Sequence, residues 1–182
     1  MERIYGYLKK MKGGDSAPSR VSLQSMLWSF TGSFLGIATV AFIHFNYLSS
    51  HALILVIGSF GASAVLIYGA IESPLAQPRN LIGGHILSAF IGVTCYKFTP
   101  EYLWLTPALA VSLSIFFMHL TRTLHPPGGA TALIAVIGGT GIHKLGYLYM
   151  IFPAASGAII MLIIALIINN LSRERKYPEF WI

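Results

Sequence analysis

The sequence predicts an all-α, polytopic transmembrane helix bundle of about six segments, and three observations support this fold class. The 182 residues are 55% hydrophobic and only 10% charged, whereas soluble domains carry about 25% charged residues. Apolar stretches free of charge recur at about the 20-residue length that crosses a bilayer core. Polar breaks rich in proline and glycine separate these stretches. The chain is long enough for one membrane domain and too short for an additional globular one.

The charge pattern favours membrane topology over nucleic-acid binding. The formal net charge is +6, but the basic residues flank apolar segments instead of forming a stripe. Cys95 is the single cysteine, so neither an intrachain disulfide nor a cysteine-based metal cluster is expected. The first 20 residues have no continuous apolar core. We therefore expect no cleavable signal peptide, and we expect the early spans to direct insertion.

The pattern divides the chain into three parts: a basic tail over 1–20, a transmembrane domain over 21–171 and a second basic tail over 172–182. Ile4, Leu8 and Met11 fall at helical spacing, which is typical of an interfacial helix. A solvated tail explains the same residues equally well. Residues 13–18 read as a linker because they combine glycine, serine and proline.

Six apolar spans are predicted within the membrane domain, at 26–45, 52–71, 81–98, 102–121, 128–142 and 147–170. The fifth is short and glycine-rich, so a thin crossing and a re-entrant hairpin are both open. With six crossings and a cytoplasmic N-terminus, ten basic residues lie on the cytoplasmic side and two on the opposite side. If residues 128–142 re-enter instead, eight lie on the cytoplasmic side and four on the opposite side. The positive-inside tendency favours six crossings with both termini in the cytoplasm. A bacterial inner membrane is the expected location.

Two breaks, residues 73–85 and 121–131, share one design: proline, arginine, histidine and glycine precede or begin a helix. Pro78 and Pro127 suit a first helical turn, where the missing N–H costs nothing. Such a turn leaves backbone N–H groups unpaired at the positive end of the helix dipole, and glycine lets a ligand approach them. Two facing breaks would resemble the broken helices of transporters.

The pattern therefore nominates an anion site. The substrate-binding candidates are Arg79, Asn80, Gly83, Gly84, His85, Arg122, His125, Gly128 and Gly129. Glu72, His119 and His125 are candidates for a proton or polar relay, since histidine titrates near neutrality. A purely structural interpretation of the same residues is an alternative. In it the breaks only end helices, the arginines are positive-inside anchors, and Glu72 forms an ion pair with Arg79. Glu72 and Glu101 are the only carboxylates between the first and last spans, which argues against a cation pathway.

Enzymatic chemistry is not expected. Membrane metalloenzymes carry ligands at His-x-x-His or Glu-x-x-His spacing. The six histidines of this sequence show neither spacing. A glycine-rich ATP loop and a nucleophile elbow are also missing from the sequence. We therefore expect neither catalytic residues nor metal nor cofactor.

Both breaks carry a family resemblance. Residues 73–80 with Gly83-Gly84-His85, and residues 120–132 with His125-Pro126-Pro127, resemble the HPP family of small integral membrane proteins. Gly128 departs from the alanine of that pattern. Members from photosynthetic organisms are associated with nitrite transport into plastids or cyanobacterial cells. The resemblance implies a transporter of nitrite or another small monovalent anion, with a passive anion channel and a non-transporting scaffold or sensor as alternatives.

The expected partners follow from this reading. They are a small anion, nitrite first, and the lipid bilayer, with nucleic acid excluded. Six short spans bury little surface, so a homo-oligomer is expected as well.

Overall fold

A computed structural model describes residues 2–11, 20–48, 54–102 and 104–182. These residues form helices and connecting segments only, which confirms the all-α prediction. The first helix, α1, spans Glu2–Lys10 and agrees with the spacing of apolar residues in the N-terminal tail. Its interfacial placement stays a prediction, and the predicted linker over 13–18 lies outside the described residues.

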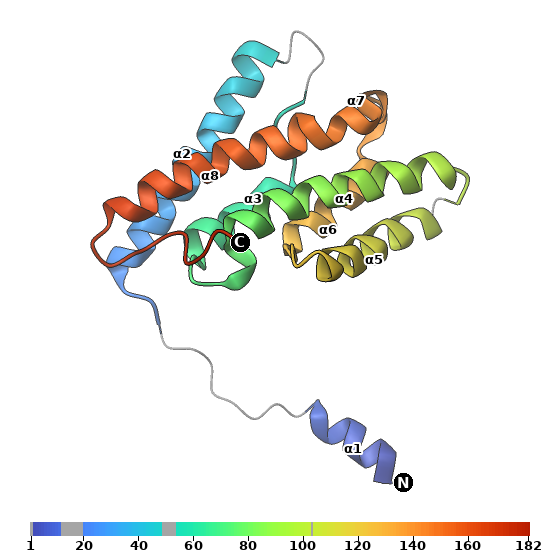
Figure 1. The fold of residues 1–182 in the computed structure, drawn as a ribbon, viewed down its shortest axis with the longest axis horizontal. Coiled ribbons are helices and arrows are strands. Elements are labelled where there is room, and N and C mark those ends of the chain that lie inside the picture. Colours follow the sequence, from blue (N-terminus) through green and yellow to red (C-terminus); the bar gives the residue numbers. More distant parts are fainter. Residues whose placement is uncertain (1, 12–19, 49–53, 103) are drawn as a thin grey trace.

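The bundle consists of two packed groups joined by a short helix (Figure 1). In one group, α4 (Pro78–Phe98), α5 (Leu105–Leu120) and α6 (Pro126–Ile137) contact one another. In the other, α2 (Leu23–Ile43) packs against α8 (Ser156–Leu171). The helix α3 (Ser59–Ala64) contacts α2, α6 and α8 and so lies between the groups. Three helical stretches have the length and apolarity to cross a membrane: Leu23–Leu48, Pro78–Phe98 and Gly139–Leu171.

The second predicted span is not a continuous helix. Residues 54–57 are non-helical, and helix begins only at Ser59, continuing through Val65–Gly69. The non-helical stretch consists of Ile, Leu, Val and Ile followed by Gly58, and β-branched residues and glycine are weak helix formers. Leu55 is 1% exposed, and its N–H donates to His44 Nδ1 at 3.3 Å. Irregular backbone at membrane depth is tolerated where protein covers it.

The segments alternate in direction between two ends of the bundle. At one end, the Arg175 guanidinium donates to the hydroxyls of Ser25 and Ser29, so the start of α2 and the end of α8 meet. At the opposite end, the rings of Tyr96 and His143 stack with centroids 3.8 Å apart. His143 belongs to α7 (Gly139–Leu145), which follows α6. The chain from α6 to α7 therefore runs from one end of the bundle to the other, and Pro126–Ile137 is among its shorter apolar helices. Whether the fifth predicted span crosses the membrane or re-enters it stays a prediction.

A ridge of small residues lets α4 and α6 run parallel in close contact. Gly84, Ser88 and Gly92 repeat every four residues along α4. A Cβ at Gly84 would lie 2.5 Å from His125 Cβ, and one at Gly92 would lie 2.6 Å from the Ala132 carbonyl oxygen. Small residues at this spacing allow helix backbones to approach inside a membrane. This close contact brings the two breaks together.

Candidate functional site

The two breaks meet at the end of the bundle where α4 and α6 both begin. Pro78 and Pro126 are the first residues of these helices, as expected for residues that lack an N–H group. Arg79 Nη2 donates to the Thr121 carbonyl at 2.8 Å, and Asn80 Nδ2 donates to the Leu124 carbonyl at 2.8 Å. Side chains of the first break therefore satisfy carbonyls that the end of α5 leaves without helical partners.

Two of the nominated glycines at this junction lie in close packing contacts, and their predicted role in substrate binding stays a prediction. A Cβ at Gly83 would lie 2.6 Å from Thr123 Cγ2, and one at Gly128 would lie 2.7 Å from Ser88 Oγ. The Gly128 N–H is also occupied, since it donates to the His125 carbonyl at 2.8 Å. In this structure these glycines permit contact between the breaks and do not present free backbone donors. Gly129 differs: its nearest neighbour would be Val111 Cγ1 at 3.8 Å.

His85 and His125 meet on one serine hydroxyl in the interior. His85 Nε2 lies 2.7 Å from Ser63 Oγ, and His125 Nε2 lies 2.9 Å from the same oxygen. The two imidazole centroids are 5.0 Å apart, and both side chains are 0% exposed. Phe60 places its ring edge-to-face with His85 at 5.2 Å. The two histidines nominated from the two breaks are thus joined through a residue of α3.

Further hydrogen bonds extend this pair in both directions. His85 Nδ1 lies 2.7 Å from Thr131 Oγ1, which lies 2.9 Å from Ser59 Oγ. At the other end, His125 Nδ1 donates to the Leu75 carbonyl at 2.9 Å. We call the series Ser59, Thr131, His85, Ser63, His125 and the Leu75 carbonyl the histidine–hydroxyl chain. It draws on four separate segments: α3, α4, α6 and the 3₁₀ turn Pro74–Ala76.

Local structure explains why these side chains converge. Ser59 and Ser63 are four residues apart on α3 and therefore share one helical face. His125 is the cap residue of α6 with φ −139° and ψ 105°, an extended conformation that precedes the first helical turn. Ser59, Ser63 and Thr131 were not predicted as site residues from the sequence. The Ser59-x-x-x-Ser63 spacing in an apolar segment was the available signal.

Three nominated residues lie away from this chain. His119 is exposed on α5 and lines an apolar groove together with Gly129. Arg122 is exposed and adopts a left-handed backbone with φ 57°. Glu72 is exposed too, and among the described residues it forms no ion pair with Arg79. The structure thus separates His119 and Glu72 from the two buried histidines.

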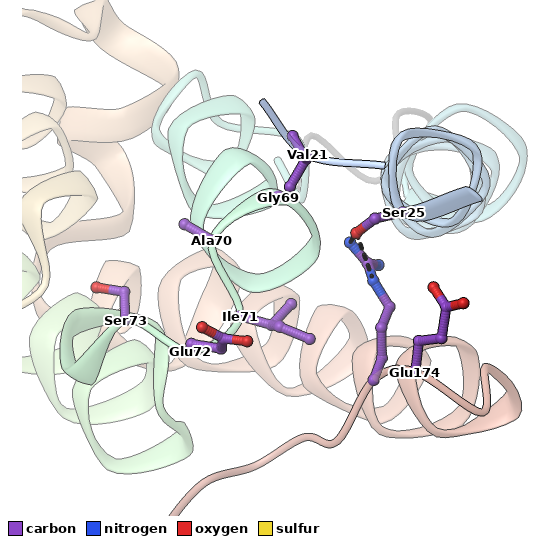
Figure 2. A pocket seen from close by; sticks show the side chains of 9 residues that line it. Val21, Ser25, Gly69, Ala70, Ile71, Glu72, Ser73 and Glu174 are labelled. Atoms are coloured by element: carbon purple, nitrogen blue, oxygen red, sulfur yellow. Dashed lines mark hydrogen bonds between the residues drawn. The ribbon is translucent and has the colours of Figure 1, made fainter. Parts of the chain in front are cut away.

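A polar pocket of about 290 Å³ lies at the same end of the bundle as the breaks. Figure 2 shows Glu72 and Ser73 of the first break on one side and Ser25 and Glu174 on the other. Arg175 lines it as well, and desolvation lowers the pKa of its guanidinium from the ordinary value.

The C-terminal tail is packed against the first break. The Tyr177 hydroxyl donates to the Ala76 carbonyl at 2.7 Å, and the Glu179 N–H donates to Gln77 Oε1 at 2.8 Å. Tyr177 itself is 2% exposed. The residues described from 172 onward therefore cover part of the break end of the bundle.

Comparison with known proteins places this geometry in a family context. The family model described as HPP, transmembrane region, matches residues 18–178. Two Dictyostelium discoideum proteins, each named only as a transmembrane protein, are 48% and 45% identical over 178 and 183 residues. The alignments cover 96% and 98% of this chain but only 57% and 64% of those relatives. No solved structure matches. Since these relatives come from an amoeba, they give no support to the expected bacterial membrane.

Proposed function

We propose, from the premise that the chain belongs to the HPP transmembrane family, that it is a membrane transporter of a small monovalent anion, with nitrite as the leading substrate. The observation that carries this proposal is the histidine–hydroxyl chain at the junction of the two breaks. Two imidazoles with 0% exposure occupy the interior of a bundle whose outer faces are apolar. Buried polar groups of this kind are costly in a membrane and mark substrate or proton pathways.

The backbone supports the same proposal. Residues 54–57 interrupt the second apolar segment, and α3 begins beside the histidines, with Ser59 and Ser63 in hydrogen-bond contact with their chain. Discontinuous helices of this type form the binding centres of secondary transporters. A scaffold would gain nothing from an interrupted span with a buried polar chain, so transport is the better explanation.

The charges favour an anion. Arg79 lies at the first turn of α4 and reaches the carbonyl next to Arg122 in the sequence. His85 follows Arg79 by six residues, which places it about 9 Å deeper along the helix. Glu72 and Glu101 are both exposed. The buried polar side chains of the described residues include these imidazoles and no carboxylate, so an anion attracted by the arginines at the break end would meet imidazoles deeper in the bundle.

Reconstitution in liposomes tests the proposal. Uptake of nitrite, nitrate, formate and chloride is measured side by side for the wild type and for His125→Gln, with empty liposomes as the leak control. Ser114→Ala is the matched control variant, because Ser114 is a buried serine whose hydroxyl donates within its own helix, to the Ala110 carbonyl at 2.7 Å. We expect nitrite uptake by the wild type and the control, and strongly reduced uptake by His125→Gln.

Each alternative has its own result. Uptake of every anion at the rate of empty liposomes would favour the scaffold or sensor. Saturable uptake that drives nitrite against its gradient would exclude a passive channel. We also propose that both termini face the cytoplasm and that the protein is a homo-oligomer. Fusion reporters at each terminus and native mass spectrometry check these two points.

A further inference from the structure

The hydrogens of the histidine–hydroxyl chain can be assigned by counting donors and acceptors. A carbonyl only accepts, so His125 must carry its hydrogen on Nδ1, where it donates to Leu75. Neutral His125 then has a bare Nε2, which needs the single hydrogen of the Ser63 hydroxyl. Because that hydrogen is used, His85 must donate from Nε2 to Ser63 Oγ. The neutral histidines are therefore opposite tautomers.

The hydrogens at the Thr131 end of the chain follow from the same donor and acceptor rules. Neutral His85 has a bare Nδ1, so the Thr131 hydroxyl donates to it. The Thr131 hydroxyl is also placed to donate to Ser59 Oγ, and its one hydrogen becomes available for that bond when His85 Nδ1 itself carries a hydrogen. Ser63 and Thr131 also have longer contacts to helix carbonyls, at 3.3 and 3.2 Å. A hydroxyl hydrogen directed to one of these carbonyls would leave a buried ring nitrogen unpaired, which is costly. The hydrogen bonds of the neutral chain thus point from Thr131 towards Leu75.

The same atomic positions accommodate one extra proton. When a proton arrives at Thr131 Oγ1, a hydrogen can pass across each successive contact: Thr131 to His85, His85 to Ser63 and Ser63 to His125. One proton has entered and His125 has become an imidazolium. His85 has changed from the Nε2–H to the Nδ1–H tautomer, each hydroxyl has exchanged one hydrogen for another, and the Thr131 hydroxyl can now donate to Ser59. Every hydrogen bond except the one to Leu75 is now reversed, and every ring nitrogen still has a partner.

We propose that the histidine–hydroxyl chain is a proton site that is loaded together with the anion, so that transport is a one-to-one, electroneutral symport. This inference rests on the proposed function. The physical reason is that the described residues around the chain provide no negative charge to balance an imidazolium. The titratable groups on the elements packed around the chain include the two histidines and three tyrosines whose hydroxyls donate to carbonyls: Tyr68 to Met161, Tyr149 to Thr131 and Tyr177 to Ala76. His119 on α5, His143 and Lys144 on α7, and Tyr147 in the turn that contains Tyr149 lie on neighbouring elements as well. Cys95, Tyr96 and Lys97 lie towards the far end of α4 and Arg79 at its start.

None of these groups is a carboxylate, and the described part of α8, Ser156–Leu171, contains no titratable residue. An imidazolium in this interior is therefore disfavoured unless an anion binds nearby. An anion is equally disfavoured without the imidazolium. Each ligand raises the affinity of the other by the same factor, as linkage requires.

The first experiment examines the hydrogens directly, in the wild-type protein. Isotope-labelled histidine in lipid-embedded protein is examined by nitrogen NMR at neutral pH and without nitrite. We expect His85 as the Nε2–H tautomer and His125 as the Nδ1–H tautomer, each assigned by comparison with a spectrum lacking that residue. The reverse tautomer at either histidine overturns the proposal whatever the transport results are.

The second experiment measures coupling in proteoliposomes with an internal pH dye. For one-to-one symport, each unit of imposed pH difference changes the steady-state nitrite ratio about tenfold, and the dye records one proton per nitrite beyond the empty-liposome leak. Nitrite uptake without proton entry overturns the coupling and leaves the proposed function standing. The lack of any protein-dependent nitrite uptake overturns both.

Hydroxyl variants then connect the coupling to the chain. Ser63→Ala and Thr131→Val remove one hydroxyl each without adding bulk, whereas Thr131→Ser keeps the hydroxyl and Ser114→Ala alters a buried serine elsewhere. We expect proton entry to fall about 100-fold in the first two variants, to be partly retained in Thr131→Ser, and to stay at the wild-type level in Ser114→Ala. Unchanged proton entry in folded Ser63→Ala protein overturns the proposal, and so does equal loss in Thr131→Val and Thr131→Ser.

Discussion

Two adjacent glycines at the start of α6 differ in the space around them, and this difference predicts opposite effects of one extra methyl group. At Gly128 a Cβ would lie 2.7 Å from Ser88 Oγ and 3.0 Å from the Gly84 carbonyl oxygen. At Gly129 it would meet only Val111 Cγ1, at an ordinary 3.8 Å. Both substitutions to alanine gain up to about 1 kcal/mol of helix propensity. Only Gly128→Ala must also push backbone apart.

The cost of that overpacking is about 1–3 kcal/mol. We therefore expect Gly128→Ala to destabilise the protein by about 1 kcal/mol and Gly129→Ala to be neutral or slightly stabilising. A difference of about 2 kcal/mol corresponds to roughly 4–8 °C in Tm for a chain of this size. Thermal unfolding of both variants in the same detergent measures it. Equal Tm values for the two variants would show that the breaks do not pack at Gly128 as described.

Three further predictions concern the site and the topology. Arg79→Lys and Arg122→Lys should retain part of nitrite uptake with a raised KM, because lysine keeps the charge but lacks the planar guanidinium that donates two hydrogen bonds. The corresponding alanine variants should lose uptake. Wild-type kinetics in both alanine variants would show that the arginines do not belong to the pathway. His119→Gln should transport like the wild type, because His119 is exposed on α5, whereas His125→Gln should not; the opposite ranking would restore His119 as a relay. Reporters fused to either terminus should place both on one side of the membrane, since Arg175 joins the end of α8 to the start of α2; opposite sides would indicate that the fifth span re-enters.

The helix starts were predictable because their signals are local. Pro78 and Pro127 were predicted in first helical turns for a reason contained in the residue itself, and the structure has them as the first residue of α4 and the second of α6. The repeated break design nominated His85 and His125. Their common partner was not predictable. Ser63 becomes a site residue only because α3 lies against α4 and α6, and a hydroxyl in an apolar segment gives no indication of its neighbour. The exposure of His119 has the same origin, since it depends on which face of α5 is covered.

The interruption at residues 54–57 also escaped the sequence reading. Hydropathy measures how apolar a stretch is, and that property is the same whether the stretch is helical or not. The covering that makes the non-helical backbone tolerable includes the His44 ring, which accepts the Leu55 N–H from another segment. Length and apolarity therefore gave the correct number of segments and the wrong conformation for one of them.

The parallel packing of α4 and α6 has an electrical consequence. Antiparallel neighbours cancel each other's dipoles, but these two helices both begin at the break end, so their positive ends add there. Arg79 and Arg122 contribute to the same end. The C-terminal ends of α5 and α8 lie at the same end of the bundle, so the positive field is local to the junction of the breaks, and anions would be concentrated there. Rectification is the expected result: the initial anion flux driven by a gradient that starts at the break end should exceed the flux driven by an equal gradient in the opposite direction. The difference should shrink as added salt screens the junction.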